Sequence, residues 1–132
     1  MNWQEIKDKH TKAFDKLIEW LNCSVEIKIE GNELVTYHRA SPAHVIMVKE
    51  VMEPRRLYDL FDEHRIYIMI DNVSYDMNTS EWTLGIWWQV KGQRKAMEHN
   101  HNFGSRKGAE YAAFNKAFGV LENTLKDDIS QR

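Results

Sequence analysis

The sequence predicts an α+β fold, an antiparallel β-sheet with three helices in the order α-β-β-β-α-β-β-β-α. Three segments place apolar residues three and four positions apart, as on one helix face, and the segments between them alternate apolar with polar residues, as in strands. A chain of 132 residues is the size of one domain. We therefore expect residues 1–132 to form a single domain. Residues 54–125 would form a sub-unit of α-β-β-β-α type, and two such halves would share the middle helix.

The first predicted helix covers residues 3–21. Asn2, followed three residues later by Glu5, has the spacing of a capping box. The apolar face of this helix consists of Trp3, Ile6, His10, Phe14, Leu17, Ile18 and Leu21.

Three strands are expected next. Residues 24–30 alternate between apolar and charged side chains, and Gly31-Asn32 is a two-residue hairpin signal that leads into a second strand near 33–39. Ser41-Pro42 breaks that strand, and a third strand is expected over 44–52.

The second half begins with a short helix, which Pro54 opens at the position that proline tolerates best. Residues 66–70 are apolar on both faces, which predicts a central or doubly covered strand. Residues 72–80 are polar and turn-like. A strand over 82–90 follows, and residues 94–102 can form one more strand.

The last helix is predicted from Arg106 to about Leu125. Its spine is formed by Phe114, Phe118, Leu121 and Leu125. Small alanines at 109, 113 and 117 allow it to lie close to a sheet.

Two neighbouring tryptophans fall on opposite faces of the strand over 82–90. Trp88 shares the apolar face and is expected in the core. Trp87, on the face with Thr83 and Gln89, is either an exposed partner anchor or stacking platform, or is covered by helices or by a second subunit.

Composition argues against several classes of function. The net charge is −2, and the lone Cys23 excludes an internal disulfide and a cysteine zinc cluster. Met1 leads into a polar stretch and no apolar run reaches 18 residues, so we expect a cytoplasmic protein with no membrane contact. The chain lacks a glycine-rich phosphate loop, a nucleophile elbow and an HExxH motif. We therefore expect a non-enzymatic protein without a cofactor.

Positive charge gathers between residues 91 and 107. The cations are Lys91, Arg94, Lys95, Arg106 and Lys107, against Glu98 alone. The last two lie where the positive end of a helix begins, with Ser105 as its cap, and unpaired N–H groups there favour an anion such as phosphate. The alternative is that these are solvated cations without a ligand.

The run from Ser105 to Phe118, SRKGAEYAAFNKAF, resembles the last helix of double-stranded RNA-binding domains, and residues 54–125 have that family's element order. The resemblance implies that Arg106 and Lys107 grip phosphates across the grooves. The chain departs from the family at Glu110, where a lysine belongs, and residues 72–80 lack its Gly-Pro-x-His loop.

A second resemblance covers the second half of the chain. The segments RLYDLFDEH, IYIMI and SRKGAEYAAFNKAFGVLE are similar to small uncharacterised proteins of bacterial phages and mobile elements. That resemblance implies a genomic setting and no particular chemistry.

Histidines suggest a minor hypothesis. His99 and His101 lie two apart, so on a strand they share one side and could provide half of a metal site. A third ligand would have to come from His38 or His44 on another strand; otherwise both are surface residues, and we expect no bound metal.

The favoured interpretation is a protein-interaction or self-associating module that uses the aromatic surface around Trp87 and the exposed strand edges. The alternative is a nucleic-acid-binding accessory protein that contacts phosphates through the 91–107 patch and the start of the last helix.

Overall fold

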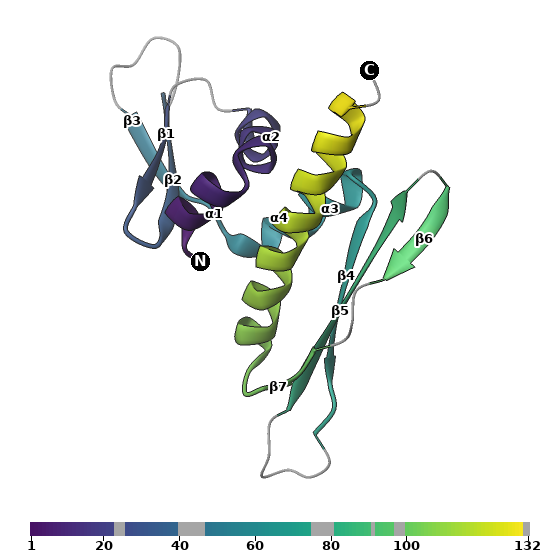
Figure 1. Cartoon of the computed structure of the whole chain (residues 1–132). Coiled ribbons are helices and arrows are strands. Elements are labelled where there is room, and N and C mark those ends of the chain that lie inside the picture. The colour runs from purple at the N-terminus through teal and green to yellow at the C-terminus, as the bar shows by residue number, and fades with distance from the viewer. Residues whose placement is uncertain (23–25, 40–46, 75–80, 91, 97–99, 131–132) are drawn as a thin grey trace. The chain divides into compact units, whose positions relative to one another are not determined.

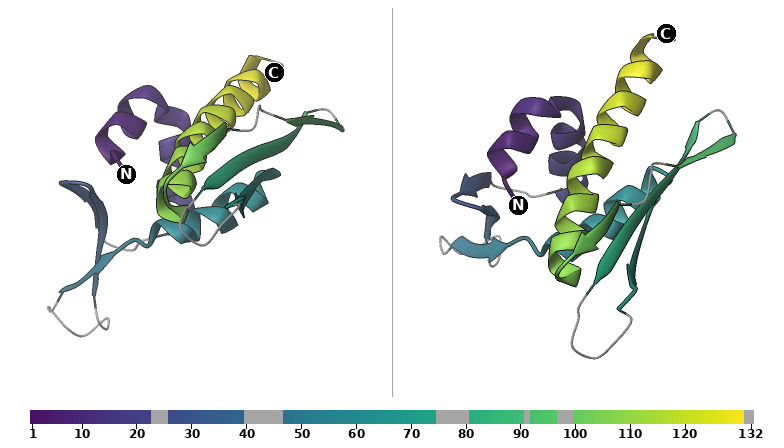
Figure 2. Two further views of the ribbon diagram at one scale, coloured as in Figure 1. Left: turned by 90° about the horizontal axis from the view of Figure 1, so that it is seen from below. Right: turned by 60° about the horizontal axis from the view of Figure 1, so that its bottom comes forward.

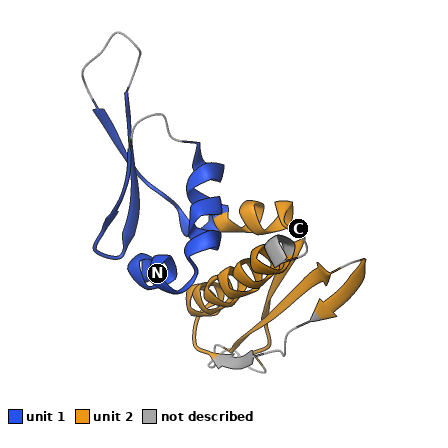
Figure 3. Cartoon of the chain, turned by 45° about the horizontal axis from the view of Figure 1, so that its top comes forward, with its two compact units in different colours: residues 1–56 blue, residues 57–132 orange. Residues whose placement is uncertain are grey.

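The structure is a computed structural model that describes residues 1–22, 26–39, 47–74, 81–90, 92–96 and 100–130, without the side chains of 96, 100–102 and 128–130. It divides into two compact units, residues 1–56 and 57–132 (Figure 3). The described residues contain four α-helices and two antiparallel sheets. The predicted α+β class is therefore confirmed. The predicted break at Ser41-Pro42 lies outside the described residues.

Unit 1 contains two helices and a three-stranded sheet (Figure 1). Its elements are α1 (Trp3–Lys9), α2 (Thr11–Leu21), β1 (Glu26–Glu30), β2 (Glu33–Arg39), β3 (Met47–Val51) and a 3-10 turn over Pro54–Arg56.

The predicted helix over residues 3–21 is broken at His10, whose backbone has φ −128° and ψ 60°. The hydroxyl of Thr11 donates to the carbonyl oxygen of Lys7 at 3.1 Å. A threonine hydroxyl that takes a backbone carbonyl in this way competes with the helical hydrogen-bond ladder. The predicted cap at the start is present, because the side chain of Asn2 accepts from the N–H of Glu5.

The sheet of unit 1 has the order β1-β2-β3. Glu30 pairs with Glu33 across the two-residue turn, and Gly31 has φ +60° there, so the predicted hairpin is confirmed. One polar cluster joins the three strands. Lys49 Nζ lies 2.8 Å from Glu30 Oε2, and the Tyr37 hydroxyl donates to the same carboxylate.

This cluster makes the stability of unit 1 depend on pH. The pKa of Glu30 lies below its ordinary value of 4.5, first because Lys49 donates a hydrogen bond to it and second because Tyr37 does. When folding lowers the pKa of a carboxyl group, the ionised group stabilises the folded state at pH values above the pKa of the unfolded chain. This stabilisation is lost as the pH falls through the pKa of the folded state. We expect thermal unfolding to show that the native chain is more stable than Glu30→Gln at about pH 7, and that the difference shrinks as the pH is lowered below about 4. A difference that stays constant with pH would contradict this role.

Unit 2 has the order α-β-β-β-β-α over its described residues. Its elements are α3 (Leu57–Glu63), β4 (Ile66–Asn72), β5 (Trp82–Val90), β6 (Gln93–Ala96), β7 (Asn100–Phe103) and α4 (Arg106–Ser130). β4 and β5 are antiparallel neighbours, and β5 pairs on its other side with β6 and then with β7. The strand predicted over 94–102 is thus two short strands along one neighbour.

Both helices of unit 2 pack on one side of its sheet, and α4 runs along β4 and β5 (Figure 2). Aromatic rings join the two helices: Phe61 meets Phe118 edge to face at 5.0 Å, and Tyr58 meets Phe114 at 5.1 Å. Beneath them lie the buried side chains of Leu84 and Ile86 on β5.

The start and the sheet-facing side of α4 follow the sequence prediction. Ser105 caps the helix by accepting from the N–H of Gly108 at 3.0 Å. The predicted alanines Ala109, Ala113 and Ala117 are fully buried, which allows the backbone of α4 to lie close to the sheet. The helix continues past residue 125 to Ser130.

Candidate interaction surface

The strand β4 differs from its prediction. Residues 66–70 are apolar on both faces, which predicted a central or doubly covered strand, but β4 is the edge of its sheet. One face follows the pattern, with Ile66 buried toward the helices. On the other face Tyr67 is 43% exposed and Met69 is 47% exposed. The prediction was wrong because the apolar pattern does not show that the cover comes from the same chain.

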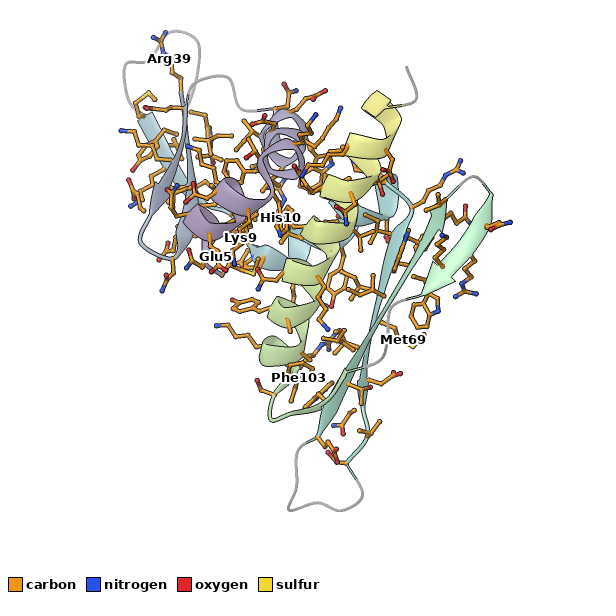
Figure 4. All side chains as sticks on the ribbon, viewed as in Figure 1. Glu5, Lys9, His10, Arg39, Met69 and Phe103 are labelled. Atoms are coloured by element: carbon orange, nitrogen blue, oxygen red, sulfur yellow. The ribbon has the colours of Figure 1, made fainter. Side chains whose placement is uncertain are left out.

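The register continues this exposed face across the sheet. Tyr67 lies opposite Trp87, and Met69 lies opposite Gly85. On the next strand Arg94 is paired with Gln89, and its guanidinium lies over the Trp87 ring at 5.4 Å from the ring centre. We name this surface the open face and define it as the side of β4-β5-β6 turned away from α3 and α4; Figure 4 marks Met69 on it.

The composition of the open face is that of a binding surface. Tyrosine, tryptophan, methionine and arginine are the residues enriched where proteins meet. Here they stand together as Tyr67, Trp87, Met69 and Arg94 on adjacent strands. Sequence reasoning named Trp87 and Arg94 but placed them in different candidate sites, and it missed Tyr67 and Met69.

The predicted core position of Trp88 needs correction. Trp88 lies on the helix-covered side of β5 as predicted, yet it is only half-buried. It lies near the end of its strand, paired with the exposed Lys95. On this side of β5 the buried side chains are those of Leu84 and Ile86, nearer the middle of the strand.

The described cations of the predicted basic patch are divided between the two sides of the sheet. Arg94 lies on the open face, whereas its neighbour Lys95 alternates to the other side. Arg106 and Lys107 begin α4, which packs on the side opposite the open face. Lys91 lies outside the described residues.

The two cations at the start of α4 contact their own helix. Arg106 Nε lies 3.7 Å from Glu110 Oε1, one turn further along. Lys107 Nζ lies over the ring of Tyr111, 5.5 Å from its centre. The Arg106 side chain is still more than half exposed, so its ion pair with Glu110 contributes little to stability. The pair nevertheless directs the Arg106 guanidinium toward a carboxylate.

The side chain of Glu110, which stands where double-stranded RNA-binding domains carry a lysine, has a structural role. It is 3% exposed and accepts a hydrogen bond of 2.9 Å from the hydroxyl of Tyr58 on α3. This bond ties the two helices together. The departure from the family pattern therefore serves the packing of unit 2.

We expect Tyr58→Phe to lower the free energy of unfolding by about 1–3 kcal/mol, because the variant withdraws a donor from a buried carboxylate. Urea titration measures this change. Tyr111→Phe, on the same helix as Glu110 and half-buried, is the matched control and should stay within about 0.5 kcal/mol of the native value. Equal losses in the two variants would contradict the role given to the Tyr58 hydroxyl.

The described residues do not provide a set of ligands for the metal site that the histidines suggested. Among the described residues no three His, Cys, Asp or Glu side chains come together in a way that could hold a metal ion. His99 and His44, and the side chain of His101, lie outside the described residues. His38 is described, and its Nε2 lies 3.3 Å from Glu50 Oε2.

Unit 1 carries a groove of about 840 Å³ that is lined by residues of α1, α2, β1 and β2. Its apolar wall is formed by Phe14, Ile18, Ile27, Ile29 and Leu34. Its charged wall carries both signs, namely Lys7, Lys28, Asp15, Glu19 and Glu26. Because the charges are mixed, they select no class of ligand.

Comparisons with known proteins do not place the chain in a family. No protein-family model matches it, and the searches of curated proteins and of solved structures find no match. Within the described part of the chain, no helix is both long enough and apolar enough to cross a bilayer.

Proposed function

We propose that this chain is a non-enzymatic protein-interaction module that binds through the open face of β4-β5-β6. One observation carries the proposal. β4 has the apolar pattern of a strand covered on both sides, yet α3 and α4 cover only one, and Tyr67 and Met69 stay about half exposed. Apolar side chains gathered on one exposed patch are typical of a surface that another molecule covers.

The side chains on this face suit a protein partner. Aromatic rings and methionine supply large contact areas, and arginine adds hydrogen bonds and stacking. Arg94 already lies over Trp87, so part of the surface is ordered before a partner arrives. A preformed surface loses less side-chain entropy on binding.

Nucleic acid is the alternative ligand. A duplex-binding surface needs several cations on one side to neutralise phosphates. Arg94 and Arg106 lie on opposite sides of the sheet, and Arg106 is turned toward Glu110. This division of charge favours the protein partner, although bases can also stack on exposed aromatic rings.

A photo-reactive amino acid in place of Met69 tests the proposal in a lysate of the source cells, where a captured second copy of the chain also counts as a protein partner. The same group in place of Asn123, which is exposed on α4, is the matched control. We expect cross-links at position 69 that survive nuclease treatment and are several-fold stronger than at position 123. Cross-links at 69 that disappear with nuclease would favour the nucleic-acid alternative. Equal yields at the two positions would refute a binding role for the open face.

A further inference from the structure

The two ends of the open face carry opposite charge. At one end Arg94 lies opposite Gln89, and at the other end Asp71 lies opposite Thr83. Both charged residues are exposed. Gln89 and Thr83 are six residues apart on β5, which corresponds to about 20 Å along a strand. The face is therefore basic at one end and acidic at the other.

The residues flanking the strands reinforce this polarity. Arg65 directly precedes β4 at the end that carries Arg94. Glu81 directly precedes β5 at the end that carries Asp71. Each end thus has two described charges of one sign.

The apolar residues lie midway between the charged ends. The midpoint of Thr83 and Gln89 on β5 is position 86, between the row of Gly85 with Met69 and the row of Trp87 with Tyr67. A two-fold axis that crosses the strands at this midpoint would exchange the two rows. It would place the Trp87 ring of one copy over the Gly85 row of the other, where Gly85 itself is buried and Met69 is the exposed side chain.

We propose that the partner of the open face is a second copy of this chain, stacked face to face with its strands antiparallel. The inference rests on the proposed function and names the partner of the same surface. The axis lays β4 of one copy over β4 of the other, so the antiparallel arrangement places Asp71 at the basic end of the other copy, in the row of Arg65, on both sides of the two-fold axis. A parallel arrangement would place like charges together at both ends, and like charges across an interface repel.

The size of the face sets the expected strength. It is about 20 Å long and two strands wide, with β6 beside only Trp87–Val90, so it is smaller than a standard interface and belongs with weak, transient contacts. We therefore expect a concentration-dependent dimer with a dissociation constant on the order of 10–100 µM. Because charged ends contribute, about 1 M salt should weaken it several-fold.

Charge exchange tests the arrangement, with sedimentation velocity at low salt as the readout. We expect Asp71→Arg to weaken the native dimer at least about tenfold, because each end of the dimer would then hold three cations against Glu81 alone. The double variant Asp71→Arg, Arg65→Asp restores opposite charges in the facing row and should return the dissociation constant to within about fivefold of the native one. Asp62→Arg, at an exposed position on α3, makes the same change in net charge away from the face and should have no effect.

Three results would overturn the inference. If the native chain stays monomeric at about 1 mM, the partner is not a second copy, and the cross-linking at position 69 alone decides the proposed function. If the native chain dimerises but Asp71→Arg dimerises equally well, the antiparallel arrangement is wrong while the face can still be the interface. If the double variant is as weak as Asp71→Arg, the charges at positions 71 and 65 do not face each other across the interface. Circular dichroism establishes that each variant is folded.

Discussion

Phe118→Ala is expected to lower the free energy of unfolding by about 3–5 kcal/mol, which is a large share of the total stability of a domain this size. Phe118 is fully buried in unit 2, and its ring meets that of Phe61 at 5.0 Å. Truncation removes this aromatic contact and leaves a cavity between α3 and α4 that the neighbouring rings fill only in part. Few single changes in the chain should have a larger effect on stability.

Urea unfolding followed by tryptophan fluorescence measures the loss, with an unchanged m value as the sign that the unfolded state is the same. Asn123→Ala, at an exposed position of the same helix, is the control and should shift stability by less than about 0.5 kcal/mol. A loss below about 1 kcal/mol for Phe118→Ala would mean that the two helices do not share a packed core.

The double substitution Tyr67→Thr, Met69→Thr is expected to leave the free energy of unfolding nearly unchanged and to weaken association. Both side chains are about half exposed, so folding stability should change little, and threonine suits a strand. Association should weaken between about 10- and 1,000-fold, since four apolar side chains leave the interface of a dimer and each contributes on the order of 1 kcal/mol.

The chain offers a matched control for this experiment. Met47 and Val51 on β3 are 42% and 43% exposed, close to the exposures of Met69 and Tyr67, and they lie in unit 1. Met47→Thr, Val51→Thr should leave association within about threefold of native. If the two double variants weakened association equally, exposed apolar area in general would be responsible and the open face would not be the specific site.

Local signals in the sequence predicted much of the fold. Gly31 marked the tight hairpin, Ser105 marked the start of α4, and the buried alanines marked the side of α4 that meets the sheet. Each of these depends on residues close in the chain. The break at His10 was missed because the apolar stripe of the predicted helix continues through it. The local signal for the break is the Thr11 hydroxyl, which donates to the carbonyl oxygen of Lys7.

The open face was harder to predict because it depends on how the strands and helices of unit 2 pack together. Residues 66–70 are apolar on both faces, and that pattern is the same whether helices, strands or a second molecule supply the second cover. Only the folded structure, in which α3 and α4 cover the other face of the sheet, shows that Tyr67 and Met69 are exposed. The pattern alone therefore predicted cover on both faces of β4 but not which molecule supplies it.

The placement of the charged residues could be predicted from the sequence only in part. Arg94 and Lys95 are adjacent in sequence, and the two-residue period of a strand separates them onto opposite faces. That much could be inferred from the sequence. The contact of Glu110 with Tyr58, 52 residues away, could not, because it depends on how α3 packs against α4.

The most direct test of the account is the mass of the native chain measured by sedimentation equilibrium across a dilution series from about 1 mM to about 1 µM. We expect the mass to fall from near that of two chains to that of one, and Tyr67→Thr, Met69→Thr to remain a single chain over a wider range. A native chain whose mass equals one chain at every concentration, and whose position 69 cross-links no more than position 123, would contradict the claim that the open face binds a protein.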